Sequence, residues 1–130
     1  MEKKRILLVD DDEDFLSATK LVLEKSGYVV ETCVSERECL AKLKIMKPDL
    51  IVCDVMMETD HSGFDLCREI RGDAGLADVP ILMLTAVDQK YPLNFSSSAG
   101  DESWLPSDDF IDKPVDAGVF VERVRKLLGE

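Results

Sequence analysis

Short apolar runs alternate with helical patterns of apolar and polar residues along the chain, and this order predicts parallel strands joined by helices. Short runs of large apolar residues, as expected for strands buried on both faces, recur through the sequence. The expected strands are at about residues 5–9, 28–33, 50–53, 81–84 and 110–112. Between most of them, apolar residues recur every three or four positions, which is typical of helices that cover a sheet.

Signals for helix ends divide the intervening segments. The first expected helix stops at Gly27, and its apolar face consists of Phe15, Leu16, Thr19, Val22 and Leu23. The sequence Ser35-Glu-Arg-Glu38 is a capping-box pattern that opens a second helix, through about Met46. Two more helices are expected, at about residues 64–71 and 116–128.

This order of elements predicts an α/β fold, a three-layer (βα)5 sandwich of the flavodoxin-like type. By analogy with that fold, the five-stranded parallel sheet has the order 2-1-3-4-5, with right-handed crossovers. We expect an atypical or missing fourth helix, because residues 86–109 contain Pro92, Pro106 and a serine-rich stretch. Two interpretations of this segment stay open: a long functional loop, or a short helix at about residues 93–98 between ordered loops.

Composition limits the classes of partner. The chain has 130 residues, which fits one domain, and 45% of them are hydrophobic, so that a real core can form. The formal net charge of −11 argues against binding to nucleic acid or to an anionic membrane surface. A basic protein surface would suit this charge better.

The cysteines point to a reducing compartment. No Cys-x-x-Cys pair occurs among the four cysteines, which are Cys33, Cys39, Cys53 and Cys67. The single histidine does not complete any of the usual zinc-binding spacings. We interpret all four as reduced structural thiols. No apolar stretch approaches the ~20 residues of a membrane span, and the N-terminus lacks a signal-peptide pattern. These features predict a cytoplasmic protein.

Polar residues gather where the expected strands end. They are Asp10, Asp11, Asp54, Thr85 and Lys113. Because open α/β sheets carry their chemistry at the carboxyl ends of strands, these side chains should meet at one edge. Three carboxylates, a hydroxyl and an ammonium suit a divalent cation and a phosphoryl group.

The acidic run after the first strand has two interpretations. Three carboxylates at one edge repel one another unless a cation such as Mg²⁺ lies between them. Residues 10–14 also fit a solvated helix N-terminus, where acids favour the helix dipole. The acidic run alone does not decide between these two interpretations. The presence of Asp54 and Lys113 at other strand ends favours the cation site. An EF-hand is excluded, because Phe15 replaces its glycine and Leu21 its glutamate.

Four motifs in order resemble the receiver domain of two-component response regulators. They are Ile-Leu-Leu-Val-Asp10-Asp11-Asp12, Pro48-Asp49-Leu-Ile-Val-Cys-Asp54-Val-Met-Met, Pro80-Ile-Leu-Met-Leu-Thr85-Ala86 and Phe110-Ile-Asp-Lys113-Pro114. The resemblance extends over essentially the whole chain, and the order of the motifs is more specific than any one of them. It implies a single receiver domain over residues 1–130, with no attached output domain.

The resemblance implies a phosphorylation site and a metal site. Asp54 is the expected phosphoacceptor, which would carry the phosphoryl group as 4-aspartylphosphate. Asp11, Asp54 and the backbone carbonyl of Met56 would bind Mg²⁺ directly, and Asp10 would bind it through water.

Further roles follow from the same resemblance. Thr85 and Lys113 would contact the phosphoryl group, and Phe110 would take the aromatic switch position whose rotamer follows Thr85. The expected donor is a histidine kinase or a phosphotransfer protein, and signalling would proceed by contact with an unknown downstream protein. Such a chain would not be an enzyme, because it would catalyse only its own phosphorylation and dephosphorylation.

The chain departs from the family pattern in two places. The loop after Asp54 is one residue longer than usual and lacks the usual proline; we interpret its His61 as an exposed loop residue. The segment after Thr85 occupies the place of the fourth helix, which is part of the family's usual output face. Its Trp104-Leu105-Pro106 is either an exposed docking patch or a buried plug that packs against the sheet.

Two other functions compete with the phosphoacceptor. A pseudo-receiver would use the same fold only for binding, as the altered loops allow. A haloacid-dehalogenase-like phosphatase is suggested by Asp10, Asp12, Thr85 and Lys113. That family needs a later strand with an acidic motif, whereas the residues after Lys113 form one expected helix.

Overall fold

The computed structural model describes most of the chain. Its backbone is described for residues 3–54, 62–86, 109–113 and 116–130, and the side chains for these residues except 62–65, 85–86, 109–110 and 112–113. The elements in this part are β1 (Arg5–Val9), α1 (Glu13–Lys25), β2 (Val29–Cys33), α2 (Glu36–Leu43), β3 (Leu50–Asp54), α3 (Ser62–Arg71), β4 (Ile81–Ala86), β5 (Asp109–Lys113) and α4 (Ala117–Leu127).

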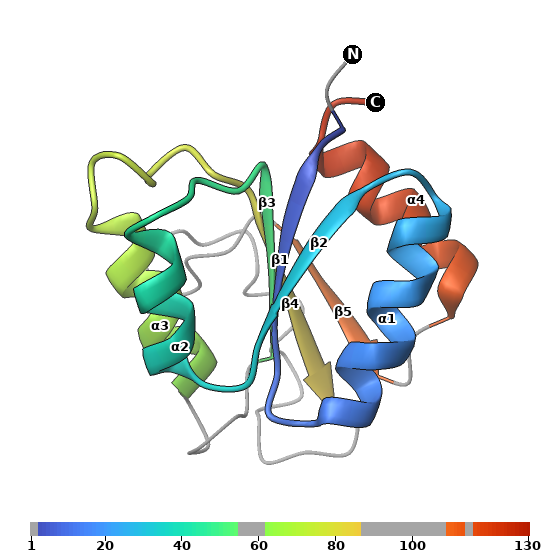
Figure 1. Cartoon of the computed structure of the whole chain (residues 1–130), viewed down its shortest axis with the longest axis horizontal. Coiled ribbons are helices and arrows are strands. Elements are labelled where there is room, and N and C mark those ends of the chain that lie inside the picture. Colours follow the sequence, from blue (N-terminus) through green and yellow to red (C-terminus); the bar gives the residue numbers. More distant parts are fainter. Residues whose placement is uncertain (1–2, 55–61, 87–108, 114–115) are drawn as a thin grey trace.

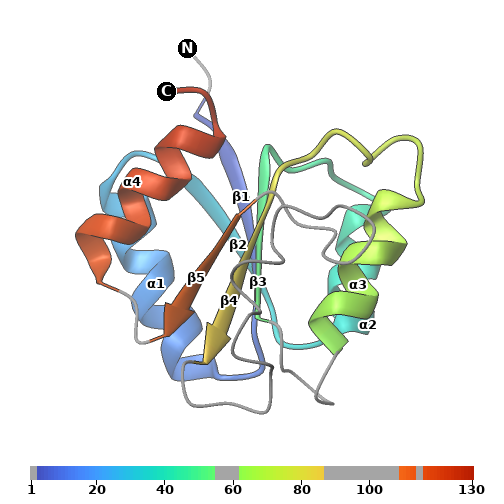
Figure 2. The same ribbon diagram turned by 180° about the vertical axis from the view of Figure 1, so that it is seen from behind.

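The strands form one parallel sheet with helices on both faces. The order β2-β1-β3-β4-β5 and the parallel pairing of all neighbours confirm the predicted flavodoxin-like topology. Helices α1 and α4 cover one face, and α2 and α3 cover the other (Figures 1 and 2). The segment in which we expected an atypical or missing fourth helix lies, with Trp104, largely outside the described residues.

Alternation along the strands divides the core into two apolar clusters. In β1, Ile6 and Leu8 join the cluster under α1 and α4, whereas Leu7 and Val9 join the one under α2 and α3. The central runs are therefore apolar throughout, because both faces of the sheet are covered. Within the described ranges, no helix is both long enough and apolar enough to span a membrane.

The helix ends follow the predicted signals with two differences. Helix α1 ends at Lys25, and Gly27 adopts a φ of +101°, which favours glycine. Helix α2 ends at Leu43 rather than near Met46, because the Ile45 amide donates to the carbonyl of Lys42 and the Ile45 side chain is 85% exposed. Helix α3 begins at Ser62, two residues before the expected start at residue 64.

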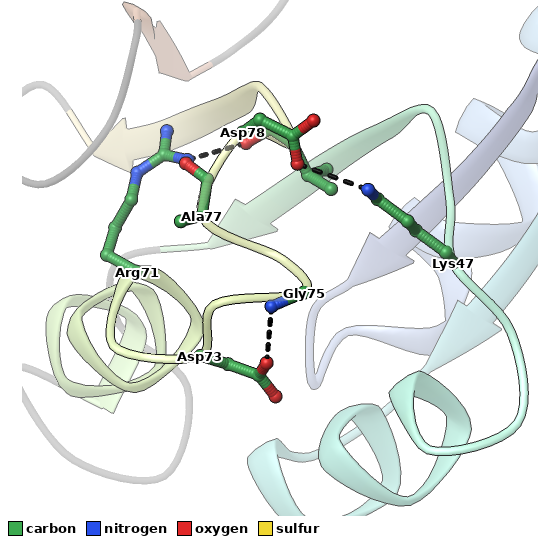
Figure 3. A network of polar contacts seen from close by, with 7 residues as sticks. Lys47, Arg71, Asp73, Gly75, Ala77 and Asp78 are labelled. Carbon is green, nitrogen blue, oxygen red and sulfur yellow. Dashed lines mark hydrogen bonds and ion pairs between the residues drawn. The ribbon is translucent and has the colours of Figure 1, made fainter.

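A polar network fastens the turn between α3 and β4, at the amino ends of the strands (Figure 3). Nη1 of Arg71 donates to the carbonyl oxygens of Ala77 at 2.8 Å and Val79 at 2.7 Å. Lys47, in the segment before β3, pairs with Asp78 at 3.2 Å. The guanidinium thus supplies a hydrogen-bond donor to two backbone carbonyls of this turn.

We predict that Arg71→Ala destabilises the fold. Removal of the guanidinium leaves the Val79 carbonyl in a partly buried place without its donor, which should lower the free energy of unfolding by about 1–3 kcal/mol. Urea unfolding followed by circular dichroism measures this change.

Lys47→Ala is the matched control from the same network. Its ion pair joins side chains that are 55% and 79% exposed, and exposed pairs contribute little. We expect an unfolding midpoint within error of the wild type. If Lys47→Ala destabilises as much as Arg71→Ala, the ion pair rather than the carbonyl contacts fastens the turn.

Candidate functional site

The register of the sheet brings two aspartates level. Val9 at the end of β1 is opposite Cys53 of β3, so that the next residues, Asp10 and Asp54, lie side by side at the carboxyl edge. Asp54 is also the last residue of its strand and pairs with Leu84 of β4. The position of both carboxylates is therefore decided by backbone pairing and not by a flexible loop.

Three carboxylates converge at this edge. Oxygen atoms of Asp10, Asp11 and Asp54 all lie within 4.8 Å of one another. Asp10 and Asp54 are only 1% and 7% exposed, whereas Asp11 faces solvent. The cluster thus has two buried members and one that opens to water.

Hydrogen bonds hold Asp10 in place. Its amide donates to the carbonyl of Cys33 at 3.1 Å, which ties the end of β1 to the end of β2. Its Oδ1 accepts the amide hydrogen of Asp12 at 3.0 Å. These contacts turn the chain sharply after the strand, and Asp10 stays buried while the chain leaves for α1.

The acidic run is divided between two tasks. Asp12 is the N-cap of α1, because its Oδ1 accepts the amide hydrogen of Phe15 at 3.1 Å. Glu13 and Asp14 occupy the first turn, where acids favour the helix dipole. Asp12, Glu13 and Asp14 therefore fit the helix N-terminus, whereas Asp10 and Asp11 belong to the cluster with Asp54, where the cation interpretation stays a prediction.

Electrostatics make the cluster a fitting cation site. Two unit charges at the outer limit of 4.8 Å repel by about 3.5 kcal/mol at an effective dielectric constant of about 20. A divalent cation among the three oxygens replaces this repulsion by attraction, and hard oxygen ligands suit Mg²⁺ or Ca²⁺. The donor set and its partial opening to water agree with an ion that retains some of its own water molecules.

The remaining predicted residues are described less fully. Thr85 and Lys113 lie at the carboxyl ends of adjacent strands, since Thr85 is opposite Asp112 and Ala86 opposite Lys113. Phe110 is opposite Met83 in the same pair of strands. The side chains of these three residues, and all of Met56 and His61, lie outside the described part of the structure. The backbone brings Thr85 and Lys113 to the same edge as Asp54.

Four buried cysteines lie on the face of the sheet that α2 and α3 cover, and this arrangement was not foreseen from the sequence. All four are reduced and buried, as expected. The four thiols lie close enough to influence one another's pKa values: Cys39 acts on Cys33, and Cys67 acts on both Cys39 and Cys53. The Cys53 thiol also lies 3.4 Å from the carbonyl oxygen of Asp54. The only signal in the sequence was that Cys53 ends an apolar run, whereas Cys33 follows Glu31 and Thr32.

The thiol contacts shift the pKa values in opposite directions. The hydrogen bond from Cys39 lowers the pKa of Cys33, although burial opposes this effect. The same bond raises the pKa of Cys39, and burial adds to it. For Cys53, the hydrogen bond with Cys67 and complete burial raise the pKa well above its usual value. Cys39 and Cys53 therefore remain protonated at neutral pH.

Comparison with known proteins gives a consistent result. A sequence model of the response regulator receiver domain matches residues 6–125. The alkaline phosphatase synthesis transcriptional regulatory protein PhoP of Bacillus subtilis is 38% identical over 125 residues, which cover 96% of this chain and 48% of PhoP. The chain thus spans about half the length of the curated relatives it matches.

Solved structures show the same architecture. A putative response regulator from Chloroflexus aurantiacus superimposes with a TM-score of 0.84 and 29% identity, covering 99% of this chain and 100% of that one. The response regulator protein TrrA of Thermotoga maritima, solved in complex with Mg²⁺–BeF, superimposes with a TM-score of 0.75 at 30% identity, covering 95% of this chain and 98% of TrrA.

The capping contact at the edge of the site predicts a graded effect. Asp12→Ala removes the acceptor of the Phe15 amide hydrogen and should lower the free energy of unfolding by about 1 kcal/mol. Asp12→Asn keeps an acceptor oxygen and should be close to the wild type. Chemical denaturation of the three proteins compares them, and equal losses in both variants would show that charge, not the cap, matters there.

Proposed function

The chain belongs to the response regulator receiver domain family, and on this premise we propose that it accepts a phosphoryl group on Asp54 in a step that depends on Mg²⁺. The observation that carries the proposal is the convergence of the Asp10, Asp11 and Asp54 oxygens within 4.8 Å. Receiver domains are signalling modules of two-component systems and not enzymes in the usual sense. Catalysis by this chain would be confined to its own phosphorylation and dephosphorylation.

The buried carboxylate of Asp54 is the proposed nucleophile. One of its oxygens attacks phosphorus of a phosphohistidine on a histidine kinase or phosphotransfer protein, and the bond from phosphorus to the imidazole nitrogen breaks. The product is a mixed anhydride, 4-aspartylphosphate, which water later hydrolyses to return the carboxylate. Burial and a strand end keep Asp54 in one position, which favours in-line attack.

The residues around Asp54 prepare the site for phosphate. Asp11 and Asp54 would hold Mg²⁺ directly with the carbonyl of Met56, and Asp10 through water. When bound, Mg²⁺ neutralises charge on the phosphoryl group and orients it. The support comes from the three oxygens on this chain and from TrrA, which was solved with Mg²⁺–BeF.

One cationic group and one hydroxyl group complete the proposed site. The Lys113 ammonium balances negative charge on the phosphoryl oxygens, and the Thr85 hydroxyl donates a hydrogen bond to one of them. Their strand ends adjoin the carboxyl edge at which Asp54 lies. Phe110 responds to Thr85 and passes the change to a downstream protein, whose identity the proposal leaves to experiment.

The family membership favours this function over the phosphatase alternative. The experiments below distinguish a phosphoacceptor from a pseudo-receiver. A pseudo-receiver would keep the fold and fail to take up phosphate. The net charge of −11 suits a partner with a basic surface, and it argues against nucleic acid as the direct partner of this domain.

Phosphorylation is tested with a small-molecule donor. With acetyl phosphate and Mg²⁺, the intact mass of the wild type should rise by one phosphoryl group, and Asp54→Asn should gain none. Asp12→Asn, which changes the charge of a neighbouring residue outside the cluster, should still be modified. If Asp54→Asn gains the same mass, the acceptor is another residue; if the wild type gains none, the chain is a pseudo-receiver.

Metal binding is tested separately by calorimetric titration with Mg²⁺. Asp11→Asn removes one charged ligand, so we expect the affinity to fall by about tenfold or more. Asp12→Asn removes the same charge from a capping residue, so its affinity should stay within about twofold of the wild type, as exposed charges are screened. Equal losses of affinity in the two variants would mean that Mg²⁺ is attracted by the overall negative charge of this region and is not bound by the cluster.

A further inference from the structure

A groove of about 450 Å³ follows helix α2 along its length. The described residues that line it are Glu36, Arg37, Leu40, Ala41 and Lys44. They extend from the first residue of the helix to its C-cap. None of them belongs to the acid cluster around Asp54. The groove is therefore a surface feature that the proposed phosphorylation does not use.

Two cations flank the middle of this groove. Arg37 and Lys44 are seven positions apart, which is two helical turns and about 10 Å along the axis. Among the residues that the structure describes, neither pairs with an acid, whereas Lys42 of the same helix pairs with Glu31 at 3.3 Å. The acid of the described lining, Glu36, lies in the first turn, where its charge favours the helix dipole. The lining thus has a local excess of positive charge in a chain whose net charge is −11.

An apolar strip lies between and beyond the two cations. Leu40 and Ala41 are about one turn from each cation, and Ile45 follows Ala41 by four positions, which places it on the same side of the helix. Helical geometry continues into this turn, because the Met46 amide donates to the carbonyl of Lys42 at 3.0 Å. Ile45 is 85% exposed, the largest fraction among the large apolar side chains that the structure describes. Burial of this strip against a partner would remove apolar surface from water.

We infer that the α2 groove binds an acidic amphipathic helix of a partner protein. Apolar side chains on one turn of such a helix cover Leu40, Ala41 and Ile45, and acids one turn before and one turn after them meet Arg37 and Lys44. Two helices that lie side by side share the same rise, so acids seven positions apart match the spacing of the two cations.

The charge and shape of the groove exclude other anionic ligands. A small dicarboxylate is too short to reach two cations that are about 10 Å apart along the helix axis. A nucleic acid is disfavoured by the net charge of −11, and it would leave the apolar strip without a partner. The inferred partner is opposite in charge to the basic surface that suits the domain as a whole, and its binding does not depend on the proposed phosphorylation.

A titration followed by nuclear magnetic resonance tests the inference. The probe is a helical peptide of alanine and glutamine that contains two glutamates seven positions apart and two adjacent leucines midway between them. Added to the ¹⁵N-labelled protein, it should shift the backbone amide signals of residues 36–45, with a Kd of about 1 mM or tighter. The same peptide with lysines in place of the glutamates should cause no such shifts. An increase of NaCl from about 0.05 M to about 0.5 M should weaken the binding severalfold, because exposed charges are screened.

Matched variants distinguish the groove from the rest of the surface. Lys44→Glu should weaken the binding by about fivefold or more, because an attraction is replaced by a repulsion. Lys25→Glu makes the same change in the last turn of α1, on the opposite face of the sheet, and should stay within about twofold of the wild type. Ile45→Ser should also weaken the binding, whereas Leu21→Ser, at an apolar residue of α1 that is 54% exposed, should not. The amide spectrum of each variant establishes that it is folded.

Three results would overturn the inference. One is that the acidic peptide causes no shifts along α2 at concentrations up to about 5 mM, which corresponds to negligible affinity. Another is that the lysine peptide or a short DNA duplex shifts the same signals as strongly. The third is that Lys25→Glu weakens the binding as much as Lys44→Glu. Asp54→Asn should bind the peptide like the wild type, so a failure of the proposed phosphorylation and a failure of this groove are distinguishable.

Discussion

The parallel register between β1 and β3 is the constraint on which the candidate site depends. Because Val9 lies opposite Cys53, the next residues along both strands are aspartates, and the sheet holds two buried carboxylates side by side. Such an arrangement costs free energy through repulsion and loss of hydration. The apolar residues of both strands, buried on both faces, stabilise the register enough to offset that cost. The strain is localised at the one edge where a cation can relieve it.

The turn after β1 separates the site from the helix that follows. Asp10 stays under the edge through its contacts with Cys33 and the Asp12 amide, while Asp12 itself caps α1. Two aspartates in the same run, Asp10 and Asp12, thus have different roles, and the direction in which the backbone turns after β1 decides which role each one has. This division also provides a control for experiments, since Asp11 and Asp12 carry the same charge but only Asp11 belongs to the cluster.

The two ends and two faces of the sheet are unequal in chemistry. The amino ends are fastened by Arg71, which holds two backbone carbonyls and thereby fixes the entry into β4 (Figure 3). The carboxyl ends carry the acids, and four buried cysteines lie on the face covered by α2 and α3. The backbone of β2 connects the acids to the cysteines, because the carbonyl of Cys33 accepts the amide hydrogen of Asp10.

The sequence by itself determined the elements, the fold class and the edge at which the acids meet. Strand and helix periods are local properties, and caps such as Ser35 with Glu38 are written in neighbouring residues. Only the tertiary structure decided which acids of the run cluster, where α2 ends, and that four separate cysteines are buried together on one face of the sheet. These features depend on the register between strands that are far apart in the chain and on which face each side chain takes. Composition and spacing cannot supply that information, because it arises only when the helices are packed on the sheet.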